Sequence, residues 1–144
     1  MSIPALNKNG ELVAGEHSAT LDEVEAVYGR SPDCRRCLMK GLRDAVDNLE
    51  QAGVKRIWID GSFVTNKKEP NNIDGCWEYS SLVDTSKLDQ VFLSRTRADA
   101  KQKYGLDFFV SQIIETGSGL PFPKFFQVNR DGRAKGIIVV RLGG

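Results

Sequence analysis

The strongest hydrophobic pattern lies between Ser31 and Gly53 and predicts an amphipathic helix. Apolar residues recur there at spacings of one, three and four: Leu38, Leu42, Ala45, Val46, Leu49 and Ala52. This spacing places them along one helical face, which a globular protein buries. Ser31-Pro32-Asp33 is a start signal with Pro32 suited to the first helical position, and Gly53 is a stop signal.

A second, shorter helix is predicted to begin after Thr20. Glu23 follows three residues later, as in a capping box, and Gly29 supplies a stop after Tyr28. The preceding residues 1–19 mix proline and glycine with polar residues. We expect this segment to form an irregular N-terminal arm.

Shorter apolar runs, rich in branched and aromatic residues, predict strands. The predicted strands are Val54–Asp60, Ile73 to about Leu82, Leu106–Ile114 and Lys135–Leu142. The mostly polar segment Thr85–Tyr104 carries a helical stripe that is interrupted near Ser94, and the Gly/Ser-rich segment Glu115–Leu120 is predicted to be a mobile loop. Together these elements predict an α+β fold in which helices flank a small mixed β-sheet.

The bulk composition fits one domain over residues 1–144. The hydrophobic fraction of 40% suffices for a core, and 27% of the residues are charged. A formal net charge of +1 argues against strong general binding to nucleic acid, which needs a basic excess. The sequence has no run of the ~20 apolar residues that cross a bilayer, and its N-terminus has no signal-peptide pattern. We therefore expect a cytoplasmic protein without membrane contact.

The cysteines raise the question of a zinc site. Cys34-x-x-Cys37 could combine with Cys76 and the single histidine, His17. A structural zinc site takes four ligands, commonly in two compact pairs, and these residues are not spaced in that way. An odd number of cysteines also fits a reducing compartment better than a disulfide framework. We therefore expect free thiols and no zinc.

Aromatic residues cluster near the C-terminal end of the chain. The cluster consists of Phe122, Phe125, Phe126 and Val128. Packing against the core is the favoured interpretation over stacking on a ligand. If the protein acts through protein contact, the same cluster could instead be an exposed partner surface.

The segment from Ile57 to Asp74 carries the residues that suggest chemistry. An apolar strand ends in Gly61-Ser62, and Asn72-x-Asp74 follows. Residues at i and i+2 of a strand face the same way, and Asp107 on a later strand would complete a cup of oxygen ligands. Such oxygens suit magnesium. A tight glycine turn lets backbone N–H groups and Ser62 approach phosphates. Lys67 or Lys68 could add positive charge, although both could also lie in a solvated loop.

This constellation resembles the polymerase-beta-like nucleotidyltransferase superfamily. The segment Gly61–Asp74 is similar in particular to a group of small uncharacterised bacterial and phage proteins with a GSFVT-x-K-x-x-PN(D)ID core, which are similar to minimal nucleotidyltransferase antitoxins. The resemblance extends from about Ile3 to Leu142. It includes Tyr104-Gly105-Leu106-Asp107 and the strand that begins Lys135-Gly136-Ile137-Ile138.

The resemblance implies a nucleotidyltransferase-like fold and a transferase activity. A nucleoside monophosphate would pass from a nucleoside triphosphate to a hydroxyl of a protein or RNA acceptor, with Mg²⁺ or Mn²⁺ as cofactor. Catalysis and metal binding would rest on Asn72, Asp74 and Asp107, and Asp107 would also help to deprotonate the acceptor. Nucleotide binding would rest on Gly61, Ser62, Thr65 and Lys67.

Asn72 departs from the acidic residue of that motif. Its amide oxygen can coordinate a metal ion, but it removes one negative charge where two dications would bind. Glu78 lies on the same strand face as Asp74 but ~13 Å along the strand, too far to share an ion. Glu69 lies in the loop and could reach. We expect the second metal site, and with it the activity, to be weakened.

Two functions therefore follow from the sequence. In the first, the chain is an active enzyme whose short length favours a protein acceptor or partner over a long nucleic acid. In the second, it is a catalytically inactive binding module with the same fold. Such a module would act by protein–protein contact, as an antitoxin, a phage-defence subunit or a counter-defence protein.

Overall fold

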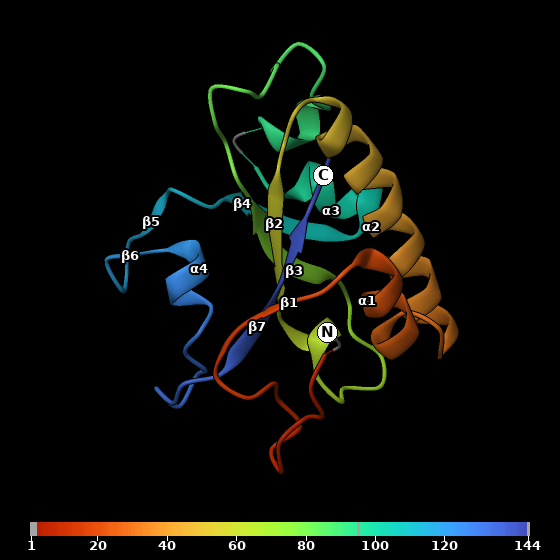
Figure 1. Cartoon of the computed structure of the whole chain (residues 1–144), viewed down its shortest axis with the longest axis vertical. Coiled ribbons are helices and arrows are strands. Elements are labelled where there is room, and N and C mark those ends of the chain that lie inside the picture. The colour runs from red at the N-terminus through yellow and green to blue at the C-terminus, as the bar shows by residue number, and fades with distance from the viewer. Residues whose placement is uncertain (1–2, 95, 144) are drawn as a thin grey trace.

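The computed structural model describes residues 3–94 and 96–143 and is built around a mixed five-stranded sheet (Figure 1). The strands, in spatial order, are β1 (Gly15–Ser18), β7 (Gly136–Arg141), β2 (Arg56–Asp60), β3 (Ile73–Trp77) and β4 (Leu106–Val110). β1 runs parallel to β7 and β3 parallel to β4, whereas β2 is antiparallel to both of its neighbours. The predicted α+β class with a small mixed sheet is confirmed.

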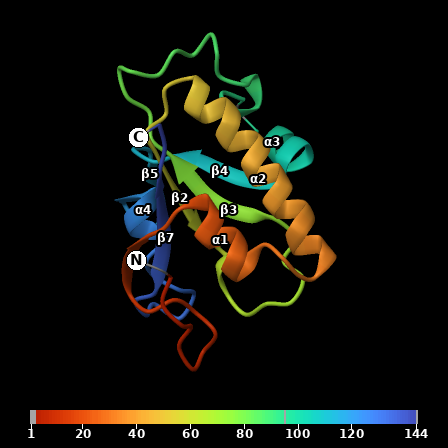
Figure 2. The same ribbon diagram turned by 45° about the vertical axis from the view of Figure 1, so that its right-hand side comes forward.

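The helices divide unequally between the two faces of the sheet. One face is covered by α1 (Leu21–Tyr28), α2 (Asp33–Gln51) and α3 (Ala98–Tyr104), as Figures 1 and 2 show. The other side carries α4 (Phe122–Phe125) and the hairpin of β5 (Ile114–Glu115) and β6 (Leu120–Pro121). Two short 3-10 helices, η1 (Ser62–Val64) and η2 (Gln90–Phe92), lie in connecting segments. Within the described ranges, every helix is too short or too polar to pass through a lipid bilayer.

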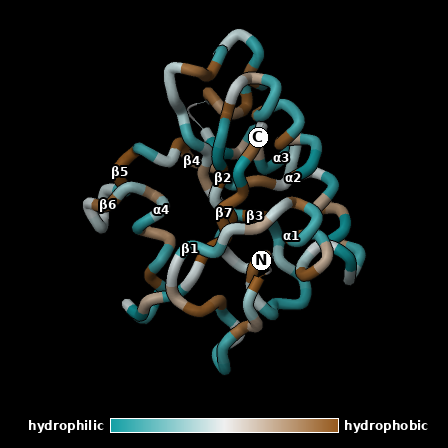
Figure 3. Tube along the Cα trace, viewed as in Figure 1, coloured by the Kyte–Doolittle hydropathy of each residue, from teal (hydrophilic) through white to brown (hydrophobic). Residues whose placement is uncertain are grey.

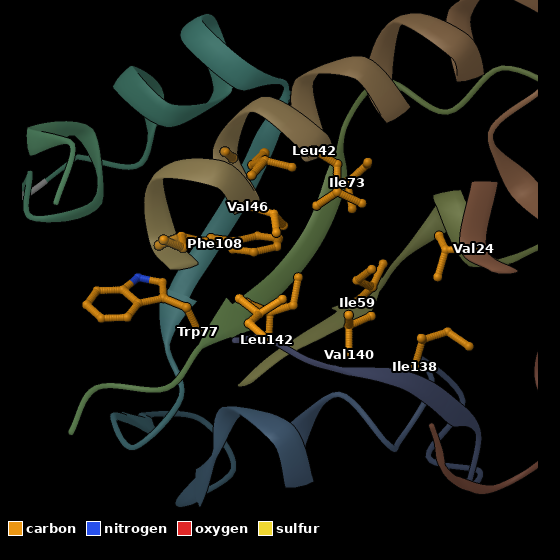
Figure 4. Packing of buried hydrophobic residues seen from close by; sticks show 14 of the residues in the cluster. Val24, Leu42, Val46, Ile59, Ile73, Trp77, Phe108, Ile138, Val140 and Leu142 are labelled. Atoms are coloured by element: carbon orange, nitrogen blue, oxygen red, sulfur yellow. The ribbon is translucent and has the colours of Figure 1, made fainter. Parts of the chain in front are cut away.

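The main core lies between α2 and the sheet. Leu42 and Val46 of α2 face Ile73 and Phe108 of the central and edge strands, as the close view in Figure 4 shows. The apolar face of α2 that the sequence predicts is confirmed, because its members are buried: Leu38, Leu42, Ala45, Val46, Leu49 and Ala52. This burial is the principal favourable term that holds the helical layer on the sheet.

A smaller core on the opposite face contains the aromatic cluster. Phe122 and Phe126 are buried against residues of the sheet, namely Trp58, Cys76, Ile137 and Val139. The Phe109 and Phe122 rings stack with their centroids 3.9 Å apart. The favoured interpretation of this cluster as core is confirmed. The proposal that it forms an exposed partner surface is wrong for the buried Phe122 and Phe126.

Several local predictions are confirmed. Thr20 caps α1: Thr20 Oγ1 accepts from the Glu23 N–H, and Glu23 Oε1 accepts from the Thr20 N–H. α2 ends beside Gly53, whose φ of 100° is typical of a glycine stop. The strands before Gly61 and after Lys135 also form, as β2 and β7.

Other boundaries differ from the prediction. The arm is not wholly irregular, because β1 pairs with the free edge of β7, and sheet pairing there outweighs the weak strand propensity of its sequence. Pro32 is the N-cap of α2 rather than its first helical residue. The strands β3 and β4 end early, at Trp77 and Val110.

Two connecting segments also differ. Among its described residues, the polar segment 85–104 forms η2 and α3 on either side of the predicted interruption near Ser94, but its first half is a short 3-10 helix rather than an α-helix, because its apolar stripe is sparse. The predicted loop Glu115–Leu120 contributes to the short hairpin β5–β6, in which Glu115 pairs with Leu120. Residues 1, 2, 95 and 144 lie outside the described part of the chain.

Gly41 permits the close approach of α2 to the end of α3, which Figure 2 shows side by side. A Cβ atom at Gly41 would overlap the carbonyl oxygen of Tyr104. Gly→Ala inside a helix is normally stabilising by ~1 kcal/mol. Here we expect Gly41→Ala to lower the free energy of unfolding by about 1–3 kcal/mol, because backbone must move. Urea unfolding measures this change. Asp47→Ala, on the exposed face of α2, should stay within about 0.5 kcal/mol, and a gain in stability for Gly41→Ala would contradict the account.

Candidate functional site

Three aspartates lie side by side at one end of the central strands. Asp60 on β2 is the register partner of Asp74 on β3, and Asp74 is the register partner of Asp107 on β4. Register partners project to the same face, with Cβ atoms ~5 Å apart. Ile57 and Ile59 face the helices, so alternation along β2 directs Asp60 to the other face, with Trp58. The sequence therefore builds a row of carboxylates on the face that α1–α3 leave open.

Gly61 turns the chain directly beside this row. Its φ is 79°, a conformation that favours glycine, and a Cβ atom there would overlap the carboxylate of Asp74. The chain then enters η1, which begins at Ser62. Gly61 thus does two things that no other residue can do: it permits the turn, and it leaves the Asp74 carboxylate its space.

Arg35 holds the segment that follows the turn. This α2 residue is 5% exposed, and its guanidinium lies 5.3 Å from the Phe63 ring centroid. It donates hydrogen bonds to five backbone carbonyl oxygens, at 2.5–3.4 Å, of Tyr28, Ser62, Phe63, Thr65 and Lys67. A guanidinium has five N–H donors in a rigid fork, which suits this role. One buried cation therefore fixes the loop from residue 62 to residue 67 against α2.

Thr65 shapes the loop from within. Its hydroxyl donates to the Ser62 carbonyl oxygen at 2.7 Å and accepts from the Lys67 N–H at 3.1 Å. The loop carbonyls therefore point toward Arg35 and Thr65. Its ordered backbone lies next to the carboxylate row.

The turn, the loop and the carboxylate row border one open cleft of about 680 Å³. Predicted site residues that line it are Gly61, Ser62, Thr65, Lys67 and Asp74. The far wall carries Phe125, Arg130 and Lys135. Five of the residues predicted from the sequence are therefore brought together in one place.

The two remaining predicted residues lie next to the cleft rather than in its wall. Asp107 is in register with Asp74 but on the edge strand β4. Asn72 directly precedes β3 and is partly exposed at a bend, so it is not a strand residue paired in register with the aspartates. Asp60, which does line the cleft, occupies the position beside Asp74 that the sequence assigns to Asn72.

Basic side chains pair with two of the three aspartates. Lys135 forms a salt bridge with Asp60, and both side chains are largely buried, at 16% and 8% exposure. Arg97 Nε lies 2.5 Å from Asp107 Oδ1, and Lys101 Nζ lies 3.5 Å from Asp107 Oδ2. The row thus brings together three carboxylates and three side-chain cations.

The environment shifts the protonation of this row. Burial, followed by repulsion from the Asp107 and Asp60 carboxylates, raises the pKa of Asp74 to about 6. Burial also raises the pKa of Asp60, and the Lys135 ammonium opposes this rise. A partly buried carboxyl group with a strongly raised pKa in a cleft is typical of functional sites.

The donor chemistry of the row fits a divalent cation that arrives with a polyphosphate. Mg²⁺ is commonly held by one or two carboxylates together with substrate phosphates, and Asp74 and Asp107 are two such carboxylates in register. Within residues 3–94 and 96–143, no three histidine, cysteine or acidic side chains form a ready-made metal cage. The phosphates would therefore have to complete the coordination.

The cysteines lie in different environments. Cys34 is partly buried, with its Sγ 3.8 Å from the Lys68 carbonyl oxygen, whereas Cys37 is exposed and Cys76 is buried. All three thiols are free.

Sequence reasoning missed five residues of this site: Asp60, Lys135, Arg35, and the two partners of Asp107, Arg97 and Lys101. A signal existed for Asp60, because a carboxylate at the end of an otherwise apolar strand, directly before Gly61, is costly to bury without a purpose. Arg35 sits among exposed charged residues at the start of α2, and Lys135 precedes the last strand, so neither differs in sequence from a surface residue. Only the tertiary arrangement identifies them.

We expect Arg35→Met to lower the free energy of unfolding by ~3 kcal/mol, since several buried carbonyl oxygens lose a charged donor. Arg36→Met is the matched control. The Arg36 side chain is 60% exposed and makes only surface contacts, a salt bridge with Asp33 and a 3.4 Å hydrogen bond to the Arg30 carbonyl oxygen, so its loss should change stability by less than about 1 kcal/mol. Denaturant unfolding of both variants checks this expectation, and equal effects would contradict it.

Asp74 should make the protein less stable at neutral pH. The folded protein binds the Asp74 proton more tightly than the unfolded chain does, so the contribution of this group falls as pH rises from about 4 to about 6. We expect Asp74→Asn to raise the free energy of unfolding at pH 7.5 by ~2 kcal/mol, and this gain to disappear at pH 4. Thermal unfolding across this pH range measures the difference. A pH-independent loss of stability would show that the ionised Asp74 supports the fold.

Comparison with known proteins identifies a family. No curated protein and no solved structure matches the chain. Residues 4–141 match a family of unknown function, DUF6932, and this range includes every residue of the cleft described above. The match spans nearly the whole chain, so the protein belongs to the DUF6932 family, whose function is unknown.

Proposed function

We propose that this protein is a nucleotidyltransferase-like protein that binds a nucleoside triphosphate with Mg²⁺ or Mn²⁺ in the cleft. One observation carries the proposal: Asp74 and Asp107 are in register beside the Gly61-Ser62 turn, and this turn borders a cleft of about 680 Å³. A glycine turn, aligned carboxylates and nearby cations are the parts that phosphoryl chemistry needs, because positioning and charge stabilisation dominate such reactions. The proposal also includes the nucleotidyltransferase-like fold that the sequence resembles.

The reaction would join the nucleoside monophosphate to a hydroxyl of a protein or RNA acceptor. The acceptor oxygen forms a bond to the α-phosphorus, and the bond from this phosphorus to the bridging oxygen of pyrophosphate breaks. The acceptor proton leaves to a carboxylate at the site, for which Asp107 is proposed, and pyrophosphate carries away the electron pair. The Ser62 hydroxyl and the Lys67 ammonium would bind the terminal phosphates, because the N–H groups of residues 64–67 already donate within the protein.

Asp74 and Asp107 would hold the cation, and Asn72 would offer a neutral oxygen from the bend before β3. The bound cation would neutralise the phosphates and activate the attacking oxygen. Asp60 supplies a carboxylate next to Asp74, which offsets part of the charge lost at Asn72. A weak activity that depends on the triphosphate for metal binding follows from this donor set.

Isothermal calorimetry with Mn²⁺ and ATP tests the proposal. We expect the native protein to bind Mn·ATP, Asn72→Asp to bind it about tenfold more tightly, and Asp74→Ala/Asp107→Ala to lose the binding. An added carboxylate strengthens the attraction for a dication by ~1–2 kcal/mol, which corresponds to that factor. Circular dichroism confirms that each variant is folded. Nucleotide binding that persists in Asp74→Ala/Asp107→Ala would contradict the proposal that these two carboxylates form the binding site.

Protein contact without catalysis is the second candidate function. Three large apolar side chains around the β5–β6 hairpin are exposed, at 54%, 52% and 39%: Ile113, Ile114 and Leu120. Figure 3 shows this stretch in brown at β5. Contiguous exposed apolar residues favour an interaction surface. If the protein acts only by contact, Asp74→Ala/Asp107→Ala should keep the biological phenotype of the native protein. If it acts as an enzyme, the same variant should lose this phenotype.

A further inference from the structure

We propose that Lys135 is a counter-ion that exchanges between two partners: it pairs with Asp60 in the structure and moves to the triphosphate when metal-nucleotide binds. This inference rests on the proposed function, because it names a residue and an event of the same site. It assigns to Lys135 a role in nucleotide binding and to Asp60 a role as the group that is released to the incoming cation.

The position of Lys135 supports both contacts. Its ammonium forms the salt bridge with Asp60, and the same side chain lines the cleft that Gly61 and Ser62 border. Its backbone N–H donates to the Gln127 carbonyl oxygen at 2.9 Å, which fixes the residue just before β7. The backbone is therefore held in place, and the exchange requires only rotation about the bonds of the four-carbon side chain.

The segment opposite the carboxylate row is shaped to present cations to the cleft. The Asn129 side chain accepts from the N–H groups of Asp131 and Arg133, both at 2.9 Å, and so forms a tight turn. The wall contributed by this segment includes Arg130 and Lys135. Lys67 approaches from the other side, on the loop that Arg35 holds. The cleft lining also includes the acidic residues Glu11 and Asp131, so the cations within reach of a polyphosphate are Lys67 on one wall and Arg130 and Lys135 on the other.

The charge balance explains why Lys135 pairs with Asp60 before a ligand arrives. Asp60 is one of the few buried polar residues, and a buried carboxylate without a partner is strongly unfavourable. Lys135 supplies the missing positive charge. A divalent cation can supply it instead, and the triphosphate then offers Lys135 a more highly charged partner. The cation takes the place of Lys135 beside Asp60, and the phosphates take the place of Asp60 beside Lys135. Binding of the metal and binding of the nucleotide therefore favour each other.

This exchange makes an unusual prediction about Lys135→Met. Free Mn²⁺ should bind at least fivefold more tightly than it binds the native protein, because Asp60 no longer has a competing ammonium ion. Mn·ATP should bind at least tenfold more weakly, because the phosphates lose a cation. Electron paramagnetic resonance counts free Mn²⁺ in the first titration, and calorimetry measures the second. A lysine that only stabilises the fold would not move the two affinities in opposite directions.

Three further variants keep the test interpretable. Lys87→Met removes an exposed lysine outside the cleft lining and should leave both affinities unchanged. Lys135→Arg retains the charge and should keep Mn·ATP binding within about threefold. Asp60→Asn/Lys135→Met removes both charges, which avoids an unpaired buried carboxylate if Lys135→Met alone does not fold. It should fold, bind Mn·ATP at least tenfold more weakly than the native protein, and show no gain in affinity for free Mn²⁺.

The outcomes separate this inference from the function on which it rests. If the native protein binds Mn·ATP and Lys135→Met binds it equally well, the exchange is wrong and the proposed function stands. If Mn·ATP binding weakens but free Mn²⁺ binding does not tighten, Lys135 contacts phosphate without releasing a metal site at Asp60, and the exchange is again wrong. If the native protein does not bind Mn·ATP, both proposals fall.

Discussion

The buried guanidinium of Arg35 is the interaction on which the site depends. The segment after β2 has little regular structure, so its carbonyl oxygens would otherwise need water or a neighbouring strand. Arg35 satisfies carbonyl oxygens at both ends of this loop, at Ser62 and Lys67, from a single position on α2. The loop is thereby attached to the helix at several points. The Gly61 turn and the Ser62 backbone are therefore held beside the carboxylate row.

A second constraint acts on the row itself. Three aspartates in adjacent register positions repel one another, and burial strengthens this repulsion. The protein limits it with cations from outside the sheet: Lys135 for Asp60, and Arg97 with Lys101 for Asp107. Asp74 lies in the middle of the row, where burial and the repulsion from its two neighbours raise its pKa to about 6. These buried charges would not stabilise a sheet whose role is only structural. They would favour the binding of a cation together with an anionic ligand.

The sequence predicts those parts of the molecule that depend on local pattern. The capping box at Thr20, the buried face of α2 and the strand that ends at Gly61 all follow from short-range spacing. Gly61, Ser62 and Asp74 could be placed in one site because a motif connects them. By contrast, β1 forms only because β7 offers a free edge, and the segment before α3 lacks enough apolar residues for the helix that its stripe suggests.

The part of the site that the sequence does not predict is long-range. The pair Lys135–Asp60 joins elements that are distant in the chain, and Arg35 reaches a loop beyond β2. Hydrophobic periodicity and secondary-structure propensity contain no information about such contacts. Register matters in the same way: Asn72 precedes β3 at a bend, and only the pairing of β2 with β3 shows that Asp60 is the carboxylate next to Asp74.

A crystal structure with Mn²⁺ and a non-hydrolysable ATP analogue is the most direct test of the central claim, that this cleft is a metal-nucleotide site. The account predicts anomalous density for manganese at the carboxylate row of Asp60, Asp74 and Asp107, phosphates at the Gly61-Ser62 turn, and the Lys135 ammonium on the phosphates rather than on Asp60. Nucleotide bound elsewhere, or crystals grown at saturating ligand with an empty cleft and the Lys135–Asp60 pair intact, would contradict it.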